Sequence, residues 1–131
     1  LQYLRQAVAA APDAPMIAAM LGHALIATEK QDYFPEAERV LKTAVNRDND
    51  NPFAWYQLGV IYDRKGDQAR AALATAERYN LTGEPKLALA SAEMALRGIP
   101  SGTADYLRAQ DIAMVSRTAV DRDKRKNRGN R

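Results

Sequence analysis

Apolar side chains recur along this chain at spacings of three and four residues, with polar side chains between them. This spacing places the apolar residues on one face of a helix. Runs of β-branched residues at period two, which indicate strands, are absent. Proline and glycine separate the periodic segments. We therefore predict an all-α chain of about seven helices, at residues 1–11, 15–28, 33–46, 52–65, 68–81, 85–97 and 103–120.

The most informative pattern lies in the fourth of these segments. It reads W-x2-L-G-x2-Y from Trp55 and is followed by a Gly-Asp turn. Trp55, Leu58 and Tyr62 share one side of the helix, so we predict that all three belong to the core. Gly59 removes a side chain where a neighbouring helix approaches closely. Gly66 is free to adopt the left-handed conformation that ends a helix.

This pattern resembles the first helix of a tetratricopeptide repeat (TPR). Leu21-Gly22-x2-Leu25 repeats it 37 residues earlier, against about 34 residues in the family, so we expect about three extra residues in the loop at 29–34. Ala37, Leu41 and Ala44 match the second helix of a repeat. The resemblance covers about residues 1–100. It implies a TPR-like right-handed superhelix of antiparallel helix pairs, whose groove binds a peptide or a partner protein.

After Gly66 the repeat pattern can be aligned in two ways. Gly66 and Gly83 are 17 residues apart, half a repeat. We expect the helix at 68–81 to close one helix pair and to begin the next. With two possible alignments, the sequence does not decide which faces of the last three helices are buried. On the helix at 103–120 the apolar face is broad, and Asp111 falls within it. Its apolar members are Ala104, Leu107, Ile112, Val115 and Ala119.

A second resemblance concerns the C-terminal half. Residues 83–96, then Ser101-Gly102 and residues 107–112, are similar to the end of bacterial periplasmic zinc metallopeptidases that carry TPRs after an HExxH domain. This resemblance implies a substrate-recruiting region and a periplasmic location, with a cytoplasmic TPR adaptor as the alternative. The chain has no HExxH, so no catalytic residue carries over. Because it does not begin with Met, we expect a fragment.

Composition argues against an enzyme. Hydrophobic residues make up 47% of the chain and aromatic residues 7%, and there is no cysteine. His23 is the single histidine and has no partner at zinc-ligand spacing. No carboxylate pair has a nucleophile beside it. We predict no catalysis, cofactor, metal or small-molecule substrate. No apolar run is long enough to span a bilayer, which leaves peripheral membrane association open.

The net charge of +3 comes from the C-terminal end. Residues 121–131 hold six basic and two acidic side chains, and the rest of the chain holds 13 basic and 14 acidic ones. We predict a repeat domain at 1–120 and a basic, disordered tail at 121–131. The tail is a candidate for weak contact with nucleic acid or an anionic surface. The repeats show no single-sign stripe, which disfavours a dedicated nucleic-acid binder.

The resemblance places the first helix of each pair on the groove. On the earlier first helix, the residues off the packed stripe are Met16, Ala19, His23, Ile26 and Ala27, whereas Met20 shares a face with Leu21 and Leu25. The predicted protein-binding residues are Phe53, Tyr56, Val60, Asp63, Arg64 and His23. Tyr56 and Arg64 are residue types common at interface hot spots. The alternative is that Tyr56 covers a neighbouring helix and Arg64 is solvated. Self-association through an exposed helix also stays open.

Overall fold

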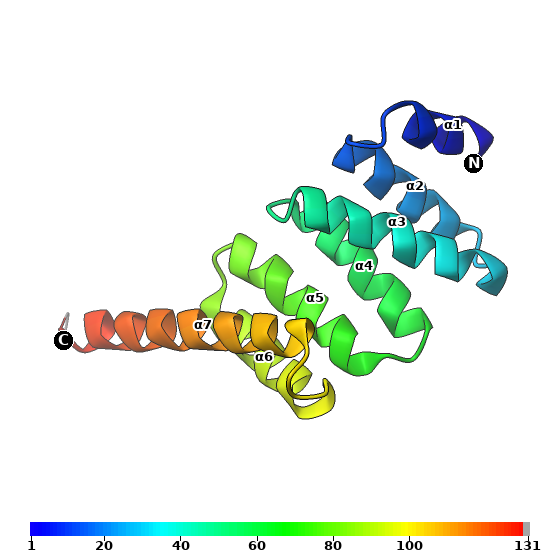
Figure 1. Ribbon diagram of the computed structural model, residues 1–131. Helices are drawn as coiled ribbons and strands as arrows, with labels where there is room; N and C mark the ends of the chain where they lie inside the picture. The colour runs from blue at the N-terminus through cyan, green and yellow to red at the C-terminus, as the bar shows by residue number, and fades with distance from the viewer. Residues whose placement is uncertain (130–131) are drawn as a thin grey trace. The chain divides into compact units, whose positions relative to one another are not determined.

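The structure is a computed structural model that describes residues 1–129. Within these residues it contains seven α-helices, one short 3-10 helix and no strand (Figure 1). The helices are α1 (Gln2–Ala10), α2 (Pro15–Ala27), α3 (Phe34–Arg47), α4 (Pro52–Arg64), α5 (Gln68–Leu81), α6 (Pro85–Gly98) and α7 (Ala104–Gly129), and the 3-10 helix η1 (Gln31–Tyr33) precedes α3. The predicted all-α fold is confirmed. Every predicted helix boundary lies within one residue of the observed one, except the end of α7.

The helices form two compact units, at residues 1–67 and 68–131. We call them the first and the second unit. In the first unit, α2 packs against α3, α4 packs against both, and α1 packs on α2. Proline stands in the first turn of α2, α3 and α4, where its missing N–H breaks no helical hydrogen bond. The η1 turn occupies the loop where the repeat spacing predicts extra residues.

Large side chains fill the first unit. Trp55, Leu58 and Tyr62 are buried, as predicted. The Trp55 indole donates its N–H to the Asn49 carbonyl at 2.8 Å, which satisfies its one polar group. A Cβ on Gly22 would overlap the Leu41 side chain. A close helix approach of the kind predicted at Gly59 is therefore present at the equivalent Gly22, and for Gly59 itself it stays a prediction.

In the second unit, α5 pairs with α6, and α7 packs against both. Its core residues are mostly small: Ala72, Leu73, Ala76, Ala88, Ala92, Ala95, Ile99, Ala109 and Ile112. The alignment in which α5 opens a pair is confirmed within this unit. Gly83 ends α5 at φ 74°, as Gly66 ends α4 at φ 81°. In both turns the residue after the glycine donates its N–H to a tyrosine carbonyl, of Tyr79 at 3.0 Å and of Tyr62 at 2.9 Å.

The face that α7 buries differs from the prediction. The buried residues are Ala109, Ile112, Ser116 and Val120. Leu107 and Val115, expected to face inward, are exposed, and so is Ala104. The reason is that the second core is built from alanines, so small side chains at positions 109 and 116 let α7 lie close to it. Asp111, which disturbed the predicted face, points to solvent.

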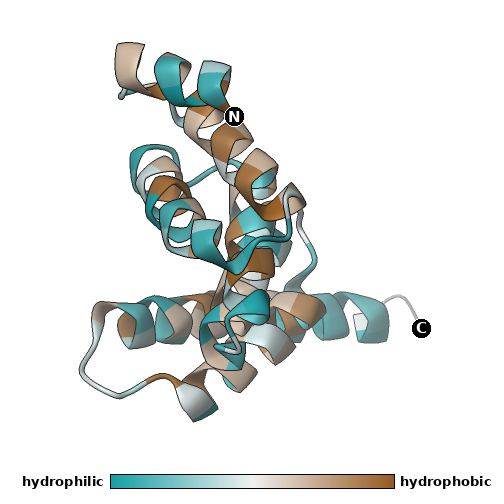
Figure 2. Ribbon diagram, turned by 90° about the vertical axis from the view of Figure 1, so that its right-hand side faces the viewer, coloured by the Kyte–Doolittle hydropathy of each residue, from teal (hydrophilic) through white to brown (hydrophobic). Residues whose placement is uncertain are grey.

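The predicted end of the last helix near Val120 is wrong. α7 continues to Gly129, and residues 121–129 are exposed helix rather than a disordered tail (Figure 2). No proline or glycine interrupts residues 104–128, and lysine and arginine favour helix. Lys126 and Arg128 also lie in the last turn, where the helix dipole favours positive charge. The last two residues of the predicted tail lie outside the described residues, and the functional separation of 121–131 stays a prediction.

Candidate functional site

The first helices of successive pairs, α2 and α4, lie side by side in the first unit. Near their N-terminal ends the Asn51 Nδ2 lies 3.9 Å from the Met16 Sδ. Near their C-terminal ends the Arg64 guanidinium lies 3.6 Å from the Glu29 carboxylate. The two helices therefore run in the same direction and present one joint surface. This α2–α4 face consists of Met16, Met20, His23, Ala27, Phe53, Tyr56, Val60 and Asp63.

The part of the face on α2 is a single helical stripe. Met16, Met20, His23 and Ala27 follow one another at spacings of four, three and four residues, and all four are exposed. Met16 and Met20 keep 52% and 48% of their surface in solvent. Two unbranched thioether side chains thus stand in solvent beside the histidine.

The part of the face on α4 contains the residues predicted for binding. Phe53, Tyr56 and Asp63 are exposed, and Val60 is half-buried. The rings of Phe53 and His23 meet edge to face, with centroids 5.9 Å apart and planes at 61°. This is an arrangement that aromatic pairs prefer. The structure therefore brings together two residues that lie 30 positions apart and were predicted separately.

Three predicted positions on α2 are corrected. Ala19 and Ile26, expected off the packed stripe, are buried, and Met20, expected on it, is exposed. The cause is that α1, α3 and α4 all contact α2, so this helix buries a wider arc than one partner would cover. The sequence did contain a signal for Met20. It lies four residues after Met16 and three before His23, on the same stripe.

Charge lies at one end of the face and is absent from its centre. Asp63 is exposed at the C-terminal end of α4, beside the Arg64–Glu29 ion pair. Arg64, predicted either to anchor a partner or to be solvated, contacts Glu29. The next basic residue, Lys65, turns toward Glu38 of α3 at 2.7 Å. Of the predicted binding residues, five thus share a face with an uncharged centre, and Arg64 borders it.

On α3 the Glu38 carboxylate contacts two lysines, Lys42 of the same helix and Lys65 at the end of α4. Burial raises the pKa of this carboxyl, but hydrogen bonds and charge from Lys65 and Lys42 outweigh burial and bring it below its ordinary value. One carboxylate thus contacts both ammonium groups and offsets one of their two charges. Neither is placed to give the α2–α4 face a positive charge.

Residues 1–129 hold neither a metal-binding cluster nor a membrane-spanning helix. No group of three or more His, Cys, Asp or Glu side chains lies together as a metal site would require. None of the helices in this part of the chain is long and apolar enough to cross a membrane.

No family model matches the chain, and no solved structure matches it. Among curated proteins, human Tetratricopeptide repeat protein 5 is 34% identical over 106 residues, which is 80% of this chain. The chain spans only 23% of that protein's length. The W-x2-L-G-x2-Y pattern, the successive helix pairs and this relative agree in one respect: the chain belongs to the tetratricopeptide repeat family.

Proposed function

We propose that this chain is a non-catalytic protein-interaction module that binds a peptide or a partner helix along the α2–α4 face. Membership of a repeat family whose stacked helices present extended binding surfaces supports a protein partner. The observation that carries the proposal is the pair of exposed stripes on two adjacent, parallel first helices. They place Met16, Met20, Phe53 and Tyr56 within one surface.

The chemistry of this surface favours an apolar partner segment. Fully burying a side chain such as Met or Phe gains roughly 1.5–3 kcal/mol, and these side chains have about half of their surface left to bury. Methionine adapts to differently shaped ligands, whereas Phe53 and Tyr56 are stiffer anchors. Because the centre carries no charge, we expect a ligand whose middle residues are apolar and whose charges lie at one end.

A peptide selection followed by mutagenesis tests this proposal. Peptides are selected from a random library against residues 1–131, synthesised with a fluorescent label and titrated by anisotropy. In the double variant Met20→Ala/Tyr56→Ala, we expect the affinity of the selected peptides to fall tenfold or more, the loss typical of removing interface anchors. Both side chains are half-exposed, so circular dichroism of the free variant should be unchanged.

The matched control removes equally exposed side chains elsewhere. Leu87 and Met94 lie on α6 of the second unit and are exposed to a similar degree. The double variant Leu87→Ala/Met94→Ala should bind the same peptides with unchanged affinity. A further pair, Tyr56→Ala/Arg64→Ala, measures how much the charged end contributes. The proposal is wrong if a folded Met20→Ala/Tyr56→Ala variant binds as tightly as the parent chain.

We also propose a parentage for the module, which rests only on the resemblance of residues 83–96, 101–102 and 107–112 to the end of periplasmic zinc metallopeptidases. In that case the chain is the recruiting region of a periplasmic protease, and the peptides that it binds are segments of protease substrates. The test is to read the gene upstream of Leu1. An HExxH domain behind a signal peptide would support this parentage, and a start codon close to Leu1 would leave a free-standing adaptor.

A further inference from the structure

One face of α7 is uncovered along most of the helix, opposite the face that packs in the second unit. Its residues follow one another at spacings of three and four and are all exposed: Ala104, Leu107, Asp111, Met114, Thr118, Arg122 and Arg125. We call this set the α7 stripe. Alternating spacings of three and four are those of a seam along which two helices pack side by side.

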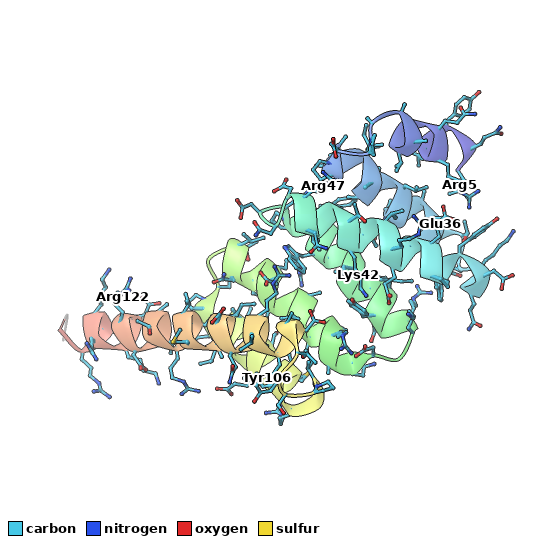
Figure 3. All side chains as sticks on the ribbon, in the orientation of Figure 1. Arg5, Glu36, Lys42, Arg47, Tyr106 and Arg122 are labelled. Carbon is cyan, nitrogen blue, oxygen red and sulfur yellow. The ribbon has the colours of Figure 1, made fainter. Side chains whose placement is uncertain are left out.

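The α7 stripe has an apolar part and a basic part. Leu107 and Met114 leave 58% and 65% of their surface in solvent, and Val115 beside them is also exposed. Leu107 and Met114, with Val115 next to the stripe, make its N-terminal half apolar, and Asp111 is the one charge there. The C-terminal half holds Arg122 and Arg125, and Arg122 points away from the helix into solvent (Figure 3).

This order of charges selects a partner and a direction. A second α7 in the parallel direction would place two basic C-terminal segments together, which is unfavourable. In the antiparallel direction, with the centre between Ser116 and Arg117, Asp111 of each copy lies opposite Arg122 of the other. Met114, Val115 and Thr118 of both copies then meet at the centre. We propose that α7 pairs with α7 of a second copy of this chain in this antiparallel arrangement.

Other occupants use only part of the stripe. A nucleic acid would contact the basic half but would leave Leu107 and Met114 in water. A membrane surface would take up the apolar side chains, yet Asp111 lies between them. In this register the second copy covers Met114 and Val115 and pairs both Asp111 carboxylates, while Leu107 lies opposite Lys126. The contact is isologous, so it closes after two copies.

The pairing goes beyond the proposed function because it uses residues of the second unit and none of the α2–α4 face. A dimer would carry two such faces. A partner with two binding segments would then be held more tightly than by one face, through effective concentration alone. Peptide affinity and self-association are separate measurements, so either proposal can fail without the other.

Sedimentation velocity on residues 1–131 tests the pairing, over loading concentrations from about 1 µM to about 500 µM, the range of weak to moderate association. The parent chain should shift from monomer to dimer across this range. Met114→Glu, at the centre of the stripe, should weaken the dimer by about a hundredfold. Met94→Glu on α6, similarly exposed, is the matched control and should leave the dimer intact.

Charge reversal tests the direction. Asp111→Arg and Arg122→Asp should each weaken self-association by about tenfold, because each puts like charges opposite each other twice. An equimolar mixture of the two single variants should recover the parent affinity, since each supplies the charge that the other lacks.

Three results would overturn the proposal. They are a monomer at every concentration, a dimer that Met114→Glu leaves unchanged, and a mixture of the two charge variants that stays as weak as its components. A labelled single-stranded oligonucleotide gives a further test. If its binding is lost with Arg122→Asp while the chain stays monomeric, the stripe is a nucleic-acid surface instead.

Discussion

The two units build helix pairs of the same kind from different side chains. The core of the first unit contains large, fully buried side chains, among them Leu21, Leu25, Leu41 and Ile61, beside alanines such as Ala37 and Ala44. In the second unit six of the nine residues in the core cluster are alanines. The fold therefore does not require one kind of core. It requires helices that meet, and the distance between them adjusts to the side chains at the contact.

This difference predicts opposite weaknesses. A core of large side chains loses most when a side chain is truncated, because a cavity remains. A core of alanines has little to lose by truncation but has no room for a larger side chain. The chain's single tryptophan, Trp55, is buried in the first unit, so its fluorescence reports unfolding there, and circular dichroism follows all helices.

The largest effect is expected for Leu41→Ala in the first unit. Leu41 is fully buried and lies against Gly22. Truncating a buried leucine costs about 2–5 kcal/mol of unfolding free energy, which denaturant titration followed by Trp55 fluorescence would measure. Val45→Ala, one helical turn away, should cost less because it removes fewer methyl groups.

A double-mutant cycle makes this prediction specific. Gly22→Ala alone should destabilise, because its Cβ would overlap Leu41. In the Leu41→Ala background the same change should be neutral or stabilising, since the space is then free and alanine favours helix over glycine by about 1 kcal/mol. Simple addition of the two losses would show that Gly22 and Leu41 do not constrain each other.

The second effect is expected for Ala92→Leu in the second unit. Ala92 is fully buried in the alanine cluster. Three extra carbon atoms there should cost about 1–3 kcal/mol, through displaced helices rather than a cavity. The matched control is Ala90→Leu, on the exposed side of the same helix, which should change stability little. If both variants were equally stable, the alanine core would be loosely packed and the contrast with the first unit would fail.

The sequence predicted the helices well because proline, glycine and helical periodicity are local signals. It predicted the burial of Trp55 and which α4 side chains lie off the core because one strong motif orients that helix. It predicted the buried faces of α2 and α7 less well, for a different reason. How much of a helix is buried depends on how many neighbours it has, and small residues such as Ala109 and Ser116 carry little hydrophobic signal.

Long-range ion pairs show the same limit. Arg5 of α1 donates two hydrogen bonds to Glu36 of α3, at 3.0 and 2.8 Å, across 31 residues of sequence (Figure 3). In the sequence Glu36 looks like any solvated glutamate on a helix. Its partner is defined only once α2 brings α1 and α3 together.

The third effect concerns the glycine turns, which the two units share. Gly66 and Gly83 both have positive φ, and a Cβ on either would meet no atom within 4 Å. Gly66→Ala and Gly83→Ala should therefore each cost about 1–2 kcal/mol through backbone strain alone. Thermal unfolding followed by circular dichroism would measure both. Clearly unequal losses would mean that the two turns are not equivalent, although their hydrogen bonds match.

The smallest effects on the unfolding free energy are expected from replacing one glutamate in each unit, Glu36 or Glu77. The two effects have opposite signs. In the first unit, the hydrogen bonds from Arg5 lower the pKa of Glu36 below its ordinary value of 4.5, despite some burial. In the second unit, burial raises the pKa of Glu77 above 4.5, and the nearby Arg108, at 3.2 Å, offsets only part of this. The fold of the first unit therefore favours the charged form of Glu36, and the fold of the second unit disfavours the charged form of Glu77.

These shifts predict opposite pH dependences. The folded chain binds fewer protons at Glu36 than the unfolded chain, so the stability that this residue contributes is present above pH 4.5 and is lost as pH falls below that value. The folded chain binds more protons at Glu77, so stability decreases as pH rises from 4.5 through its raised pKa.

At pH 7, Glu36→Gln should therefore lower the unfolding free energy and Glu77→Gln should raise it, with both differences shrinking in acid. Denaturant titrations between about pH 3 and pH 7 would measure this, because that range covers ordinary glutamate titration. A shift of the same sign in both variants would mean that burial does not dominate at Glu77, and this contrast between the units would be lost.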